Sequence, residues 1–281
     1  MAIKQLIPEN VKAYLRETVQ RILNRSLKMA AREQGLDKLA SRLEEIVPDI
    51  TDQYSRFKIN NTFLRTKVRC QHSFQISLVQ KVINEFERPV IVDVGDSAGT
   101  HLQYIMGLYN KKKLECLSVN LDLKAVERIK EKGLKAVHAK AEDLPRYDIN
   151  ADIFLCFEIL EHLMNPCFFL HELSEKTNAK YLVFTVPYRK ESRVGLSHIR
   201  SGQKENVYAE NTHIFELNPE DWKLISKHSG WDIVEEGIFL QYPRMGLLRV
   251  TQPLWKYSDF EGFYGLILKR DNAWSSKYED W

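Results

Sequence analysis

The sequence predicts an α/β fold, in which an open, doubly wound and mostly parallel sheet follows a helical region. From Pro89 onward, short apolar runs alternate with helical patterns, the order expected of parallel strands joined by right-handed crossovers. The first run, "PVIVDV", is a continuous β-branched segment, which is typical of a strand buried on both faces. Near the C-terminus two runs follow each other with no convincing helix between them, which predicts an antiparallel pair at one edge of the sheet.

Length and composition limit the classes of protein that fit. With 281 residues, 44% of them hydrophobic, the chain suits one enlarged domain or one domain with an appendage. It has no run of eighteen apolar residues and no apolar leader, so we expect no membrane span and a cytoplasmic location. Four cysteines without a C-x-x-C pair favour free thiols. A net charge of +3 permits an anionic partner without requiring one.

The region 1–88 reads as helical. A helix is expected from Pro8, with an apolar stripe formed by Val11, Leu15, Val19 and Ile22. Packing on its own domain or on a second subunit, as in a homodimer, is the ordinary interpretation, and a membrane-surface helix is the alternative. Residues 74–86 predict another helix that ends before Pro89. We expect this region to form a cap, a substrate wall or an oligomer contact.

Residues 89–281 supply the sheet domain. Its seven expected strands are 89–94, 114–121, 134–139, 151–157, 180–187, 231–241 and 263–270. Helical patterns cover 99–109, 123–133, 165–176 and 218–230. Asn165 and Asn218 are each followed by proline, which predicts an N-cap and a first helical turn, and Gly133 and Gly230 are expected at helix ends. Two stretches, 187–215 and 241–260, are insertions into this domain.

The loop "DVGDSAGT" after the first strand is the first candidate for ligand binding. Ligands of open α/β sheets bind beyond the carboxyl ends of the strands, near the switch point. Gly95 and Gly99 let the backbone approach a ligand, but their spacing is not the G-x-G-x-x-G of dinucleotide sites. The following helix offers its N-terminal amides to an anionic group. A ligand with a carboxylate, a cationic centre and a nucleoside fits this loop, with Asp93 and Asp96 near the cationic part.

Motifs from Pro89 to Arg270 resemble, in order, those of the class I S-adenosylmethionine-dependent methyltransferases, whose sheet is Rossmann-like. "DVGDSAG" is similar to the family's glycine loop, with Ser97 in place of the middle glycine. "SVNLDLKAVERIK" resembles the ribose segment, with Asn120 at the usual acid and Asp122 two residues further on. "AKAEDLP" resembles the adenine loop and "ADIFLCFEILEHLMNP" the fourth-strand motif. The resemblance implies S-adenosylmethionine held by Asp93, Gly95, Asp96, Ser97, Gly99, Asn120 or Asp122, Ala141, Glu142, Cys156 and Phe157.

The string "FEILEHL" brings acids and a histidine close to the expected methyl donor. Glu158, Glu161 and His162 are spaced i, i+3 and i+4, which predicts one shared helical face, and His213 follows on a long loop. These groups could bind a divalent metal, Mn, Fe or Zn, or Mg through the oxygens. E-x-x-E-H with a distant histidine resembles O-methyltransferases of ubiquinone biosynthesis and of small-RNA 3′ ends. A metal-free base, His162 or His213, and a purely structural role are the alternatives.

The segment 187–215 is too long for a simple connector, and we expect it to be an acceptor-binding lid. Residues 61–72 could supply the opposite wall, with 241–260 adding to it or binding a partner subunit.

The expected function is O-methylation of a small hydroxylated metabolite by in-line methyl transfer. The alternatives are a catalytically silent methyltransferase-fold binding subunit, an RNA-directed methyltransferase, and a nicotinamide-dependent oxidoreductase. The chain shows no RNA-binding module, so a nucleic-acid partner is not the first expectation.

Overall fold

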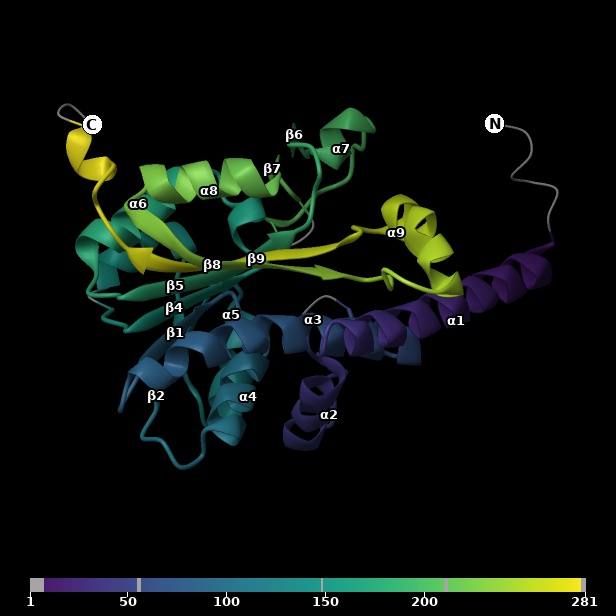
Figure 1. Cartoon of the computed structure of the whole chain (residues 1–281), viewed down its shortest axis with the longest axis horizontal. Helices are drawn as coiled ribbons and strands as arrows, with labels where there is room; N and C mark the ends of the chain where they lie inside the picture. The colour runs from purple at the N-terminus through teal and green to yellow at the C-terminus, as the bar shows by residue number, and fades with distance from the viewer. Residues whose placement is uncertain (1–7, 55–56, 148, 210–211, 279–281) are drawn as a thin grey trace.

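The computed structural model describes residues 8–278 apart from 55–56, 148 and 210–211. Its centre is a seven-stranded sheet in the order β3-β2-β1-β4-β5-β9-β8 (Figure 1). The strands are β1 Val90–Val94, β2 Glu115–Asn120, β3 Lys135–His138, β4 Ile153–Phe157, β5 Tyr181–Pro187, β8 Trp231–Leu240 and β9 Gly262–Arg270. The expected α/β architecture with a mostly parallel sheet is therefore confirmed.

The strand pairing fixes where the ends of the strands gather. Strands β3, β2, β1, β4 and β5 are mutually parallel, and β9 runs antiparallel to both β5 and β8. The edge strand β8 thus belongs to an antiparallel pair, as predicted. The strand order reverses at β1 and β4, whose carboxyl ends flank the switch point where ligands of such sheets bind. The start of β9 and the end of β8 reach that same edge.

Helices cover both faces of the sheet (Figure 1). They are α1 Glu9–Glu33, α2 Asp37–Ile46, α3 Thr62–Val82, α4 Thr100–Leu108, α5 Leu123–Glu131, α6 Pro166–Lys176 and α8 Pro219–His228. Along β1, Ile91 joins the apolar cluster beneath α1–α4, while Val92 and Val94 join the cluster beneath α6 and α8. This alternation is why the strand is β-branched apart from Asp93, whose neighbours Val92 and Val94 face the α6–α8 side.

The helix starts follow the capping chemistry of the sequence. Asn165 Oδ1 accepts the Phe168 amide at 3.0 Å, and Asn218 Oδ1 accepts the Asp221 amide at 2.9 Å, as expected for N-caps. Asn61 caps α3 in the same way, at 2.8 Å from the amide of Leu64. Residues 62–72 are therefore the first half of α3 rather than a separate segment before a helix at 74–86.

One buried guanidinium joins the N-terminal helices to the sheet domain. Arg69 of α3 donates to the carbonyl oxygens of Leu43 at 3.1 Å and Val47 at 2.8 Å. Both carbonyls lie at the end of α2, where the Leu43 oxygen also accepts the Val47 amide at 3.0 Å and the Val47 oxygen lies past the last helical turn. The same guanidinium donates to the hydroxyl of Tyr104 in α4. Arg69 therefore satisfies three acceptors on two neighbouring helices.

Replacing Arg69 with methionine is expected to lower the free energy of unfolding by about 2–4 kcal/mol, because the Val47 carbonyl and the Tyr104 hydroxyl lose their charged donor in a buried place. Urea denaturation monitored by circular dichroism measures the change. The matched control is Arg42→Met, which removes an exposed ion pair with Glu45 and should cost less than about 0.5 kcal/mol. Equal losses in the two variants would contradict the proposed role of Arg69.

The two insertions lie at the edge of the sheet that carries the carboxyl strand ends. The segment 187–215 contains α7 Ser197–Arg200 and the strand β6 Arg193–Val194, which pairs with β7 Phe215–Glu216. The segment 241–260 contains the 3-10 helix η6 Leu247–Thr251 and α9 Gln252–Ser258. Ser26 Oγ of α1 lies 2.6 Å from Thr251 Oγ1, so this second insertion is anchored to α1, as Figure 1 shows. Among the described residues, no helix is long and apolar enough to cross a membrane.

Candidate functional site

The glycine loop turns sharply where β1 ends. Gly95 has φ +88° and Gly99 has φ +69°, both in the left-handed region that favours glycine. The Gly95 amide donates to Val119 O of β2 at 2.8 Å. A Cβ on Gly95 would lie 2.1 Å from Ile159 Cδ1, so the loop and the chain after β4 are in close contact. Helix α4 begins at Thr100, one residue after the start expected at Gly99, which is its N-cap.

Two aspartates and a histidine gather behind this loop. His101 Nδ1 lies 3.1 Å from Asp93 Oδ2, and the His101 amide donates to Asp96 Oδ2 at 2.9 Å. All three side chains are buried. Asp93 Oδ1, Asp96 Oδ1 and His101 Nε2 have no partner among the described residues. Buried polar atoms normally do have partners, so this cluster has the unsatisfied groups that a ligand would complete.

Burial sets the protonation of this cluster. It raises the pKa of Asp93 to about 7, against the opposing effect of His101. The pKa of His101 is raised above its ordinary value, because the neighbouring carboxyls of Asp96 and Asp93 outweigh the effect of burial. The pair therefore holds a shared proton near neutral pH and can respond to a cationic ligand group.

The expected ribose residues both make local contacts. Asn120 is buried, its Nδ2 donates to Asp96 O at 3.3 Å, and its Oδ1 accepts the Asp122 amide at 2.8 Å. Asp122 Oδ1 caps α5 by accepting the Lys124 amide at 3.0 Å. Asn120 thus links the glycine loop to the end of β2, and Asp122 stands half-buried beside it.

The remaining expected cofactor residues differ in burial. Cys156 is fully buried within the sheet core. Phe157 is buried at the end of β4, and its ring meets the His101 ring edge-on, with centroids 5.0 Å apart. Ser97, Ala141 and Glu142 are half-buried in the loops after β1 and β3. The structure therefore places Phe157 against the Asp93 cluster and Cys156 in the packed interior.

A second polar cluster follows β4. Glu161, His162 and His213 offer ligand atoms that all lie within 4.8 Å of one another. The two imidazole rings meet edge-on with centroids 4.7 Å apart. Ile214 donates its amide to Glu161 O at 2.7 Å, and this bond holds the long loop that carries His213 against the end of β4. Both Glu161 carboxylate oxygens are buried without partners among the described residues.

The spacing prediction for these acids is partly wrong. Glu158 has φ +55°, and Leu160–His162 form a 3-10 turn (η4), not an α-helix. Because the chain reverses at Glu158, that residue does not share a helical face with Glu161 and His162, and it lies outside the group of three. Its Oε1 is nevertheless a buried atom without a partner among the described residues.

Burial disfavours charge throughout this second cluster. It raises the pKa of Glu158 to about 8 and raises that of Glu161 well above its usual range, where the nearby Glu158 adds to the effect. Burial and His213 lower the pKa of His162 to about 4. His162 is therefore neutral at pH 7, and its Nδ1 donates to Thr212 O at 3.0 Å. The lone pair is then on Nε2, which lies 3.9 Å from Glu161 Oε1.

These pKa values predict that the protein without ligands loses stability between about pH 6.5 and 8. Glu158 and Asp93 have folded pKa values of about 8 and 7, raised from 4.5 and 3.8. Their contribution to the free energy of unfolding is fully present below the pKa values of the unfolded chain. It is lost as the pH rises through the pKa values of the folded chain. His162, with its lowered pKa, is neutral in both states across most of this window. We expect the free energy of unfolding to fall by about 2–3 kcal/mol across this range.

Urea denaturation at pH 6.5, 7.2 and 8 tests this dependence, with Glu158→Gln as the control, because this variant removes one of the two titrations. A wild-type profile that stayed flat or rose would show that these acids ionise as freely in the folded state as in the unfolded one.

Three residues of the site were not predicted from the sequence. His101 lies in the first turn of α4 and completes the aspartate cluster. Glu216 accepts from Arg193 Nε at 2.6 Å and lies 3.4 Å from His213 Nδ1, while the ring of Phe260 stacks on His213 with centroids 5.3 Å apart. His101 has a sequence signal, since it lies two residues after Gly99. Glu216 and Phe260 have none, because their positions depend on how the insertions fold back.

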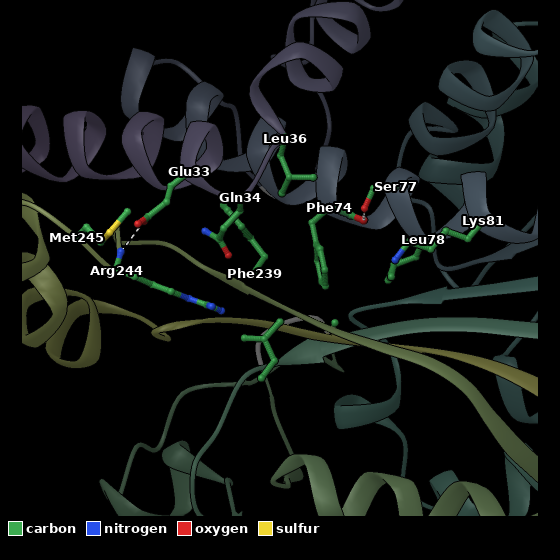
Figure 2. A pocket seen from close by; sticks show the side chains of 12 residues that line it. Glu33, Gln34, Leu36, Phe74, Ser77, Leu78, Lys81, Phe239, Arg244 and Met245 are labelled. Carbon is green, nitrogen blue, oxygen red and sulfur yellow. Dashed lines mark hydrogen bonds between the residues drawn. The ribbon is translucent and has the colours of Figure 1, made fainter.

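A pocket of about 660 Å³ lies away from both clusters, between α1, α3 and β8 (Figure 2). Its floor is apolar and includes Phe74, Leu78 and Phe239. Lys81 at its rim pairs with Glu235, and Glu33 accepts the Arg244 amide at 2.5 Å. Because Lys81 and Glu33 are already engaged and the buried polar atoms without hydrogen-bond partners lie elsewhere, we place the chemistry at the strand ends.

The sheet order, the turn at Gly95 and the clusters beyond β1 and β4 define a class I S-adenosylmethionine-dependent methyltransferase fold. Residues 92–178 match the model of the methyltransferase domain family. The chain is 22% identical, over 166 residues, to a tRNA U34 carboxymethyltransferase of Campylobacter jejuni. That match covers 58% of the chain and 55% of the relative, about half of its length.

Solved structures share the fold at low sequence identity. Coclaurine N-methyltransferase bound to N-methylheliamine and S-adenosylhomocysteine superposes with a TM-score of 0.55 at 12% identity, over 95% of this chain and 96% of that one. The [4+2]-cyclase SpnF superposes with a TM-score of 0.54 at 12% identity, over 86% and 97%. These similarities show the fold alone, and the second protein's name shows that the fold does not determine the reaction.

Proposed function

We propose that this chain transfers the methyl group of S-adenosylmethionine to an oxygen of a small hydroxylated acceptor. The observation that carries the proposal is the pair of buried clusters at the switch point. The Asp93–Asp96–His101 cluster lies beyond β1 and the Glu161–His162–His213 cluster beyond β4, and both have buried polar atoms without partners. One cluster suits the donor and the other suits the acceptor hydroxyl.

The first cluster fits the amino-acid end of S-adenosylmethionine. Asp93 and Asp96 would accept from its ammonium group, and the amides after Gly95 would hold its carboxylate. Phe157, Glu142 and either Asn120 or Asp122 would contact the nucleoside. The cofactor supplies a methyl group already activated by a positively charged sulfur. The chain must then align the acceptor with that methyl and exclude water.

The second cluster fits the removal of the acceptor's proton. His162 is neutral, with the lone pair on Nε2, and can accept that proton. The two imidazoles and the Glu161 carboxylate also form a donor set suited to Mn, Fe or Zn, and Mg²⁺ would bind through the carboxylate oxygens. A divalent ion held by Glu161, His162 and His213 would lower the pKa of the acceptor hydroxyl.

Isothermal titration calorimetry with S-adenosylmethionine and S-adenosylhomocysteine tests whether the first cluster binds the methyl donor. The Asp93→Asn variant is expected to bind both nucleosides more weakly. Release of S-adenosylhomocysteine from a panel of catechols, sugars and hydroxy acids, with and without chelator, tests the second half. Binding without turnover on any acceptor would favour the silent binding subunit. The absence of binding to either nucleoside would overturn the proposal.

An RNA acceptor is the second candidate, favoured by the sequence similarity to tRNA U34 carboxymethyltransferases. The same release assay with unmodified tRNA in place of the small acceptors distinguishes the two. Turnover on tRNA alone would reassign the substrate and leave the cofactor site as proposed.

A further inference from the structure

A second pocket, of about 440 Å³, lies at the carboxyl-end edge of the sheet. It is formed where β5 and β8 end, and both insertions contribute to it. Tyr188 comes from the start of the 187–215 segment, and Tyr242, Arg244, Arg249 and Gln252 come from the 241–260 segment. Its volume is within the range of small-ligand sites. The roles proposed above for the two polar clusters do not use this pocket.

The lining of this pocket is cationic and aromatic. It contains two arginines and two tyrosines but no carboxylate. Arg244 and Arg249 are exposed, and in the part of the chain that the structure describes neither guanidinium forms an ion pair or a hydrogen bond. Figure 2 shows that only the backbone nitrogen of Arg244 is joined to Glu33, so that its side chain remains available. Two arginines whose guanidinium groups pair with no carboxylate among the described residues can attract an anion.

A buried acid behind the wall holds the other polar groups in place. Glu261 Oε2 accepts from the Tyr242 hydroxyl and from Gln252 Nε2, both at 2.9 Å, and lies 3.4 Å from Lys190 Nζ. Its charge is therefore balanced by groups other than the two arginines. Glu261 fixes the orientation of Tyr242 and Gln252, and Arg244 and Arg249 remain as uncompensated positive charge.

The pocket lies close to the second catalytic cluster along the chain and in space. Phe260 stacks on His213, and the next residue is Glu261, which holds the pocket wall. Tyr188 donates its amide to Gly262 O at 2.8 Å. The segment 260–262 thus has His213 on one side and the cationic pocket on the other. An acceptor whose hydroxyl is near His162 could extend past Phe260 into this pocket.

We propose that the pocket binds a phosphate group of the methyl acceptor through Arg244 and Arg249. The planar guanidinium forks match phosphate oxygens, and the tyrosine rings enclose the part of the acceptor that joins the phosphate to the hydroxyl. This proposal rests on the proposed function for the identity of the ligand as an acceptor. A phosphorylated metabolite and the backbone of an RNA present the same chemistry to this pocket.

Calorimetric titration of the full chain with inorganic phosphate tests the pocket directly. We compare wild type with the Arg244→Gln/Arg249→Gln double variant and with Arg16→Gln/Arg25→Gln, which removes two exposed arginines of α1. The affinity for phosphate should fall at least about tenfold in the first variant and remain unchanged in the second. Equal affinity in all three proteins, or no binding to wild type, would overturn the proposal.

Two further arms identify the source of the phosphate and separate this proposal from the previous one. A ribose phosphate and an unmodified tRNA are titrated in the same way. Loss of ribose-phosphate binding in the pocket variant indicates a small acceptor, and loss of tRNA binding alone indicates an RNA backbone.

S-adenosylmethionine is titrated into the same proteins to separate the phosphate proposal from the proposed function. If the pocket variant keeps its cofactor affinity and loses phosphate, both proposals stand. Phosphate binding without cofactor binding in wild type would sink the proposed function alone.

Discussion

Replacing Glu161 with glutamine is expected to lower kcat/KM by about 10²–10⁴-fold, because Glu161 lies 3.9 Å from His162 Nε2 in the cluster proposed to take up the acceptor's proton. The free energy of unfolding should stay level or rise. Glu161 is 1% exposed and has no partner for either oxygen among the described residues. In the absence of a ligand its charge is therefore a cost to the folded state. The amide keeps the shape of the side chain and removes the cost of ionisation.

The matched control is Glu216→Gln, a buried acid in the opposite situation. Glu216 is 7% exposed, but Arg193 and His213 hold it, and their hydrogen bonds lower its pKa to about 2 against the effect of burial. Its loss should cost about 1–2 kcal/mol, because a charged partner is left behind. Urea denaturation at pH 7.5 measures both variants. A Glu161→Gln protein that was active and less stable would show that Glu161 is structural.

The fold could be predicted largely because the sheet is buried on both faces. A β-branched run such as residues 90–92 can hardly be exposed, and each Asn-Pro pair marked a helix start by local chemistry alone. The start of α3 was missed because its first half carries buried polar residues, including Arg69 and His72, which interrupt the apolar periodicity. Their burial depends on contacts with α2 and α4 that no local pattern contains.

The site could be predicted less completely, for similar reasons. Adjacent strand ends were enough to bring Asp93, Asp96 and Asn120 together, since parallel strands end at one edge. The chain reversal at Glu158 was not predictable, because a glutamate with positive φ is a strained choice. The cationic pocket depends on two insertions that meet in space although more than fifty residues separate Tyr188 from Tyr242.

The second large effect is expected at Gly95, where alanine should destabilise the protein by about 3 kcal/mol and weaken binding of S-adenosylmethionine at least about tenfold. Two costs combine there. The φ of +88° is unfavourable for any residue with a Cβ, and the new methyl would lie 2.1 Å from Ile159 Cδ1. Gly133→Ala carries the backbone cost without the steric cost, because Gly133 has φ +77° but nothing within 4 Å of its Cβ position. It should cost only about 1 kcal/mol.

The steric part can then be tested on its own by adding Ile159→Ala. If contact with Ile159 causes the extra cost, the two substitutions will couple, and the double variant will be more stable than the sum of the single effects requires. Cofactor affinity should not recover, because the backbone at residue 95 must itself approach the ligand. Calorimetry and urea denaturation on the four proteins separate these effects. If both the free energy of unfolding and the cofactor affinity recovered in the double variant, Gly95 would serve only the packing of Ile159. It would then have no direct part in holding the methyl donor.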